Sequence, residues 1–328
     1  MKPLASLSLD LDNKWSYMKT HGDAGWETFP SYLDVVVPRT LEFFKERNLN
    51  ITFFIVGQDA ALDKNKEAMQ QLGASGHEIG NHSFNHEPWL HLYSKQEIED
   101  ELKRAEDAIE TATGHKPIGF RGPGYSLSQS VLETLKKLNY RYDCSTFPTY
   151  LGPLARAYYF MTAPKLKDDE QEKRKILFGK FSDGFQPLKP YAWQIENETL
   201  TEIPVTTMPL FKVPIHVSYI VYLSGFSALL ARAYFKTALT FCSMTKTPMS
   251  LLLHPLDFLG ADDIPELRFF PGMNMESKRK LKIVSDVLAM MANKFEVVNM
   301  RRHAEAVESK TNLQMRDAAS IRAEIAEA

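Results

Sequence analysis

Short apolar runs alternate with amphipathic segments along most of this chain of 328 residues. Apolar residues at helical spacing mark the segments between the runs, and Ser94 with Glu97 three residues later forms a capping box. Recurrent βα units predict a parallel α/β barrel with its active site at the carboxyl ends of the strands. The candidate strands lie at 4–11, 51–56, 77–82, 118–121, 141–146, 200–206, 250–254 and 295–300, and the candidate helices at 35–48, 97–113, 128–138 and 277–292.

One α/β barrel can reach this length as a single domain, so we expect a single barrel over residues 1–303. The segment 147–199 breaks the alternation with a charge run at 165–175, followed by an aromatic stretch rich in Pro and Gly. We predict that this segment is an insertion folded over the barrel mouth, where it would shape specificity. The Ala- and Glu-rich tail at 304–328 is predicted to be a terminal helix that frays.

Charge and cysteine content exclude some classes of function. The 39 basic and 41 acidic residues nearly cancel, so the composition gives no sign of a basic nucleic-acid-binding face, and we do not expect nucleic acid as a partner. Cys144 and Cys242 lie far apart, and we predict two buried free thiols, which permits a reducing compartment. The N-terminus has no basic region followed by a long apolar core, so we expect no signal peptide and a cytoplasmic location.

The segment 213–231 contains no Asp, Glu, Lys or Arg. Pro214, His216 and Gly225 would make it a poor membrane-spanning helix. We predict a buried strand or a loop that runs into a helix. Peripheral attachment to a bilayer through this apolar segment stays open as the alternative.

Acidic and imidazole side chains follow the predicted strands. Asp10 and Asp12 are two residues apart, which places both carboxylates on one side of the first strand, where a cation or an arginine must compensate them. His82 and His86 follow another strand. Two imidazoles and one carboxylate can hold a divalent ion and leave positions open for water. A histidine pair at this spacing is often a surface coincidence, so the interpretation depends on the other motifs.

Two further strand ends complete a hydrolytic pattern. Arg121 begins a Gly- and Pro-rich turn that could present a backbone N–H to a developing oxyanion, although the turn could equally be only a tight connection. His254 follows the apolar run 251–253. A lone histidine there is usually structural, but beside a metal ion it is a candidate general acid.

In this order the motifs resemble the NodB-homology polysaccharide deacetylases (carbohydrate esterase family 4), closely over about residues 5–145 and again from His254. The spacing Asp10-Leu11-Asp12 is similar to the variant subgroup whose two aspartates are separated by one residue. The resemblance implies roles for the residues that match the motifs. By this resemblance Asp10 is the base, Arg121 orients it, and His254 protonates the leaving amine. The implied metal ligands are Asp12, His82 and His86, with Ser83 bracing them. Gly124 would supply the oxyanion N–H, and Tyr125 would form a wall of the site.

Two residues keep alternative roles. Asp143 either orients His254 or makes an ordinary hydrogen bond at the end of its strand. Trp15, in an aromatic loop after the first strand, either contacts the face of a sugar or packs to hold the loop.

The resemblance implies a distorted (β/α) barrel and a divalent metal ion, zinc above all. The implied reaction is removal of an N-acyl group, acetyl or formyl, from an aminosugar glycan or a lipid-linked sugar. Two other interpretations stay open. One is a hydrolase of cyclic amides or ureides, similar to allantoinase, and the other is a carbohydrate-binding barrel without catalysis. The second predicts the loss of at least one catalytic position, yet all of the implied catalytic and metal-ligating residues are present.

Overall fold

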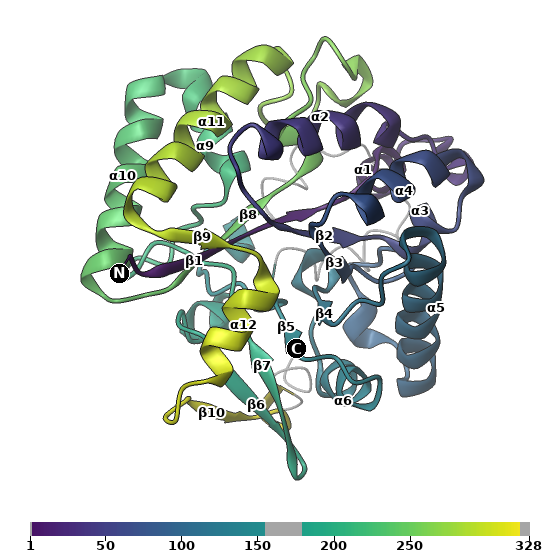
Figure 1. Ribbon diagram of the computed structural model, residues 1–328, viewed down its shortest axis with the longest axis vertical. Coiled ribbons are helices and arrows are strands. Elements are labelled where there is room, and N and C mark those ends of the chain that lie inside the picture. The colour runs from purple at the N-terminus through teal and green to yellow at the C-terminus, as the bar shows by residue number, and fades with distance from the viewer. Residues whose placement is uncertain (1, 155–178, 322–328) are drawn as a thin grey trace.

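The computed structural model describes residues 2–154 and 179–321, and their strands form one mixed sheet of ten strands (Figure 1). Nine strands follow the order β10-β6-β7-β5-β4-β3-β2-β1-β8, and β9 pairs with β1 beside this path. All pairings are parallel except that of β6 with β7. The strands are β1 Leu4–Asp10, β2 Thr52–Ile55, β3 Glu78–Asn81, β4 Gly119–Phe120, β5 Tyr142–Asp143, β6 Tyr191–Ile195, β7 Glu198–Glu202, β8 Met249–Leu253, β9 Glu296–Val298 and β10 Met315–Asp317.

Helices surround this sheet (Figure 1). The group α9, α10 and α11 packs beside β1 and β8, while α5 and α6 lie beside β3 and β4. The capping box predicted at Ser94 and Glu97 is present, and α5 buries its apolar stripe. The helices are α1 Lys14–His21, α2 Leu33–Lys45, α3 Gly57–Ala60, α4 Lys66–Ala74, α5 Lys95–Thr113, α6 Gln129–Lys137, α9 Val217–Phe226, α10 Ala228–Met244, α11 Ser277–Lys294 and α12 Met300–Glu308.

Each predicted strand is present, with shifts at the ends. The last one stops at Val298 because the side chain of Asn299 caps α12 by accepting from the N–H of Arg302. In the uncharged segment, the loop 213–216 runs into α9, which is one of the two predicted arrangements. Ser227 then ends α9 and caps α10, so the segment forms a helical corner.

Two strands of the sheet were not predicted. Part of the segment assigned to an insertion, Tyr191–Ile195, forms β6 and pairs with β7. The C-terminal tail is helical to Glu308, and Met315–Asp317 then adds β10 to the edge of the sheet. Residues 155–178 and 322–328 lie outside the described residues, so the lid over the barrel mouth stays a prediction.

Both cysteines are free and buried, as predicted. Among the described helices, none combines the length and the apolar character needed to cross a bilayer.

Candidate active site

The register of the parallel strands brings the predicted polar residues to one edge of the sheet. Leu9 of β1 lies opposite Leu253 of β8, so Asp10 and His254 follow at neighbouring positions. Asn81 of β3 lies opposite Phe120 of β4, so His82 and Arg121 do the same. The carboxyl ends of these strands therefore meet where a parallel α/β fold carries its active site.

Asp12, His82 and His86 form one cluster, which we call the candidate metal site. Asp12 Oδ1 lies 3.0 Å from His86 Nε2 and 3.4 Å from His82 Nε2, and one ligand atom of each residue lies within 4.8 Å of the others. Burial by itself raises the pKa of Asp12, but the two histidines outweigh it and hold that pKa well below its ordinary value. A carboxylate oxygen and two imidazole nitrogens are a donor set that suits zinc and similar divalent ions.

The backbone fixes which nitrogen of His82 faces this site. His82 Nδ1 lies 2.6 Å from the carbonyl oxygen of Arg121, which can only accept, so Nδ1 carries the hydrogen. The lone pair of Nε2 is then directed toward Asp12. This arrangement, in which the second ring nitrogen donates to a carbonyl, is typical of metal-binding histidines.

The turn that carries the histidines is strained. Ser83 and His86 have φ angles of 61° and 53°, in the left-handed region that residues other than glycine rarely adopt. Local hydrogen bonds hold the turn, since Ser83 Oγ accepts from the N–H of His86 at 3.2 Å. The side chain of Glu101 accepts from the N–H of Phe84 at 3.0 Å and from Asn85 Nδ2 at 2.6 Å. These contacts agree with the bracing role that the resemblance implies for Ser83.

Asp10 pairs with Arg121, as expected for two close carboxylates of which only one faces a metal site. Arg121 Nη1 lies 2.6 Å from Asp10 Oδ1 and 2.9 Å from Ser8 Oγ, and its Nε donates to the carbonyl of Cys144 at 3.2 Å. The guanidinium is fully buried, and the charge of Asp10 outweighs burial and raises the pKa of Arg121. The pair therefore fixes the position of the Asp10 carboxylate beside the candidate metal site.

The turn after Arg121 is also held in an uncommon conformation. Gly124 and Tyr125 have φ angles of 57° and 63°. The ring of Tyr125 stacks on Phe147 with centroids 4.5 Å apart, and the N–H of Gly122 donates to Ser145 Oγ at 2.8 Å. Gly124 is an exposed residue of this turn.

The contacts of Asp143 favour one of its two predicted roles. Asp143 Oδ1 accepts from Ser145 Oγ at 2.7 Å, and its carboxyl group hydrogen-bonds with that of Glu202 on β7. Burial raises the pKa of both carboxyl groups, and the charge of Asp143 raises the pKa of Glu202 further. Asp143 has the alternative role, an ordinary hydrogen bond at the end of its strand, because β5 lies next to β7 and not next to β8.

The contacts of His254 come from residues that the sequence did not assign to it. Its Nδ1 lies 3.2 Å from Ser218 Oγ in α9, and its backbone N–H donates to Asp257 Oδ2 at 2.8 Å. His216, at the start of α9, lies with its ring centroid 5.7 Å from that of His254. A capping signal was available for Asp257, because a carboxylate three residues after His254 can bond to the start of the turn. Ser218 and His216 had no local signal.

Trp15 lies behind the candidate metal site and cannot contact a sugar face. Its side chain is buried, with only 1% of its surface exposed, and its Nε1 donates to Asp59 Oδ1 at 2.9 Å. The indole meets the ring of His86 edge-on at 6.4 Å between centroids. Of the two predicted roles, the structure supports packing: Trp15 supports the ligand His86 from behind.

Comparisons with known proteins place part of this chain in a known family. Residues 19–142 match the polysaccharide deacetylase family. The peptidoglycan deacetylase of Helicobacter pylori is 34% identical over 112 residues, which cover 34% of this chain and 37% of the relative. The peptidoglycan-N-acetylmuramic acid deacetylase PdaA of Bacillus subtilis is 30% identical over 111 residues, which cover 34% of this chain and 41% of the relative. The chain thus spans about two fifths of the length of these curated relatives.

A solved structure extends the similarity to nearly the whole chain. A Mycobacterium smegmatis protein assigned to the polysaccharide deacetylases superposes with a TM-score of 0.62 at 18% identity, and the match covers 96% of this chain and 93% of that one. At this identity the match concerns the fold alone. It confirms the predicted α/β fold, including the part beyond residue 142.

Proposed function

We propose that this chain, whose residues 19–142 match the polysaccharide deacetylase family, is a metal-dependent hydrolase that removes the N-acyl group of an aminosugar in a glycan. One observation carries the proposal: the candidate metal site lies beside the buried ion pair of Asp10 with Arg121. The names of the two bacterial relatives, both peptidoglycan deacetylases, support an N-acetylated sugar polymer as the substrate class.

The site residues divide the work of amide hydrolysis. Asp12, His82 and His86 would hold the divalent ion, and zinc fits their donor set; when bound, the ion polarises the acyl carbonyl and the attacking water. Asp10, oriented by Arg121, accepts a proton from that water as its oxygen bonds to the carbonyl carbon.

The remaining groups act on the oxyanion and on the leaving amine. The backbone N–H of Gly124 donates to the oxygen of the tetrahedral intermediate. His254 gives a proton to the amine nitrogen as the carbon–nitrogen bond breaks, and the products are the free amine and the carboxylic acid. Ser218 and Asp257 orient His254 through the contacts described above.

The finer predictions remain proposals. These are the subgroup with Asp-x-Asp spacing, the choice between acetyl and formyl, a lipid-linked sugar, and a cytoplasmic location. No contact among the described residues specifically favours a cyclic amide or ureide as the substrate. A binding barrel without catalysis would not need the ion pair of Asp10 with Arg121 directed at a metal site.

Release of acetate or formate from N-acetylated and N-formylated aminosugars and peptidoglycan fragments tests this function. With zinc bound, we expect turnover by the wild type, and loss of turnover with retained metal in Asp10→Asn. His82→Ala should instead lose the metal. Matched controls are Asp34→Asn and His115→Ala, which replace exposed residues of the same types. Full activity in Asp10→Asn, or unchanged metal stoichiometry in His82→Ala, would contradict the assigned roles.

A further inference from the structure

Large apolar side chains gather where α9 meets α10, at a surface that we call the α9–α10 corner: Tyr222, Phe226, Leu229 and Leu230. The side chains of Phe226, Leu229 and Leu230 are 72%, 79% and 57% exposed, and the ring of Tyr222 meets that of Phe226 edge-on at 5.2 Å. Ser227 fixes the corner, because it ends α9 and its side chain accepts from the N–H of Leu230. Adjacent exposed apolar side chains of this size mark a surface that binds a partner.

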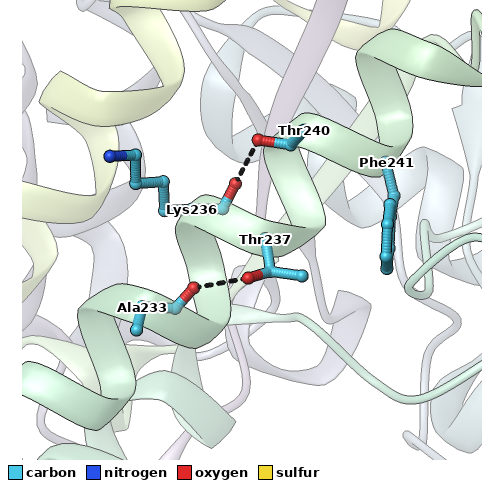
Figure 2. Close-up of a pocket in the computed structure, with 5 residues that line it drawn as sticks. All are labelled: Ala233, Lys236, Thr237, Thr240 and Phe241. Carbon is cyan, nitrogen blue, oxygen red and sulfur yellow. Dashed lines mark hydrogen bonds between the residues drawn. The ribbon is translucent and has the colours of Figure 1, made fainter.

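The chain around this corner is basic and free of acidic residues. Residues 203–256 contain four Lys or Arg residues and no Asp or Glu. Arg232 and Lys236 lie exposed on the first turns of α10 after the corner. Figure 2 shows the outer face of α10, where the hydroxyls of Thr237 and Thr240 bind backbone carbonyls of their own helix at 2.9 Å each. Lys236 is exposed on this face and forms no ion pair within the described part of the chain.

The neighbouring helix extends the positive charge. Helix α11 packs against α9 and α10, and the three helices stand together in Figure 1. Its first turns carry the exposed basic residues Lys278, Arg279 and Lys282, whereas Lys280 is buried, and the acidic residues of this helix and its N-cap are Asp286 and Glu276. Arg279 reaches the end of α9, where its Nη2 donates to the carbonyl of Ser224 at 3.3 Å. An apolar corner is thus bordered by cations from two helices.

We propose that the α9–α10 corner docks on the surface of an anionic bilayer. Large apolar side chains that enter the boundary between headgroups and acyl chains, bordered by Lys and Arg that face lipid phosphates, are the pattern of helices that lie in a membrane interface. A second copy of this chain fits the corner less well. A two-fold contact through the same surface would bring Arg232 and Lys236 against an equally basic surface of the second copy, with no acidic residue of 203–256 to compensate them.

Helix α9 connects this corner to the candidate active site. The helix begins next to His254, where Ser218 contacts the imidazole, and it ends at Phe226. Its ten residues span about 15 Å at 1.5 Å per residue. Docking of the corner would therefore hold His254 about one helix length from the bilayer surface. A docked chain would act on a glycan presented at a membrane. That consequence rests on the proposed function, whereas the docking itself does not.

Co-sedimentation with vesicles tests the docking. The zinc-loaded full chain is mixed with vesicles of phosphatidylcholine alone or of phosphatidylcholine with phosphatidylglycerol. We expect binding to the anionic vesicles that weakens as salt is added. Each cation near an anionic surface strengthens binding about five-fold, so Arg232→Glu with Lys236→Glu should weaken it more than about ten-fold. Replacing Phe226, Leu229 and Leu230 by serine should weaken binding by at least about ten-fold as well.

Matched controls alter charge and apolar surface elsewhere. Lys66→Glu with Lys103→Glu reverses two exposed lysines, and Leu92→Ser removes an exposed leucine far from α9 in the sequence. Both controls should bind like the wild type. Thermal melting and zinc content establish that each variant is folded.

Three outcomes would overturn the docking. The first is no binding of the wild type to anionic vesicles, and the second is binding by both corner variants that equals that of the wild type. The third is no vesicle binding together with a wild-type dimer that dissociates in the serine variant, which would assign the corner to a second copy. Acyl release from a water-soluble fragment reports on the proposed function separately. It should be equal in the wild type and the corner variants, and its complete absence would refute the function while leaving the vesicle result in place.

Discussion

Replacing Asp59 by asparagine should stabilise the metal-free protein at alkaline pH relative to the wild type. Asp59 lies in α3 with 1% of its surface exposed. Its Oδ1 accepts from Asn13 Nδ2 at 2.7 Å and from Trp15 Nε1 at 2.9 Å, and its buried Oδ2 has no hydrogen-bond partner among the described residues. Burial raises the pKa of Asp59 to about 7, against the pull of these donors and with a further contribution from the charge of Asp12.

The direction of the effect follows from proton binding. Between the ordinary pKa of 3.8 and the raised pKa of about 7, the folded protein keeps a proton that the unfolded chain has lost. Folding stability therefore falls as pH rises through this window, and the full cost is present above it. Each pKa unit corresponds to about 1.4 kcal/mol, and about two of the three units lie above pH 5. Asparagine does not ionise, so the stability of Asp59→Asn minus that of the wild type should rise by about 3 kcal/mol from pH 5 to pH 8.

Urea denaturation in the presence of a chelator measures this difference, by extrapolating the free energy of unfolding to zero denaturant at several pH values. Groups that titrate equally in both proteins cancel in the subtraction. Asp263→Asn is the matched control. The hydrogen bonds of Arg39 to Asp263, at 2.6 and 2.7 Å, outweigh burial and lower the pKa of that carboxyl. The stability that Asp263 contributes is fully present above the pKa of this residue in the unfolded chain. The difference in free energy of unfolding between Asp263→Asn and the wild type should therefore stay constant from pH 5 to pH 8.

A constant difference for Asp59→Asn over the same range would refute the reasoning. It would mean that Asp59 is ionised throughout in the folded protein and that the donors from Asn13 and Trp15 compensate its burial fully.

Two further substitutions test the packing around the site. Arg121→Met leaves the carboxylate of Asp10 buried without its partner, and we expect a loss of about 3–5 kcal/mol in the free energy of unfolding; unchanged stability in urea would contradict a buried ion pair. Gly119→Ala would place a Cβ 2.0 Å from the ring of Tyr142, so it should lower stability by about 1–3 kcal/mol or more. Its control, Gly225→Ala in α9, meets no atom within 4 Å and should stabilise by about 0.5–1 kcal/mol, so equal effects of the two alanines on thermal unfolding would refute the steric argument.

The clustering of Asp12, His82 and His86 was predictable, because it depends on strand ends and their parallel pairing. Strand period and parallel pairing place Asp12 and the two histidines at the same edge, whatever the details of the sheet. The partner of Arg121 followed from charge, since two carboxylates as close as Asp10 and Asp12 require compensation. Strand geometry was sufficient to predict the first feature, and the repulsion of like charges was sufficient to predict the second.

The contacts of Asp143 and Trp15 were not predictable, because they depend on long-range arrangement. Asp143 meets Glu202 only because β5 lies beside β7, and no local pattern indicates that order. Trp15 is buried because Asp59, more than forty residues later in the sequence, supplies an acceptor for its N–H. An aromatic residue after a strand has the same sequence signature whether it faces substrate or supports a ligand from behind.

The two strands β6 and β10 at one end of the sheet were missed for another reason. Tyr191–Ile195 is short and follows a stretch rich in Pro and Gly, and Met315–Asp317 has only three residues. Periodicity over so few residues does not distinguish a strand from a loop. These strands form through their pairing: β7 and β10 flank β6, and the indole N–H of Trp193 donates to the buried Glu202 at 2.9 Å.

Arg121 links the two halves of the candidate active site through different atoms. Its guanidinium holds Asp10, and its carbonyl oxygen accepts from His82 Nδ1. Arg121→Met removes the first contact and keeps the second, because the backbone N–H of Arg121 stays paired with the carbonyl of Asn81. The orientation of His82 should therefore survive the loss of the base's partner. Under the proposed mechanism, metal binding and proton transfer are therefore separable at this residue, although both depend on the same strand end.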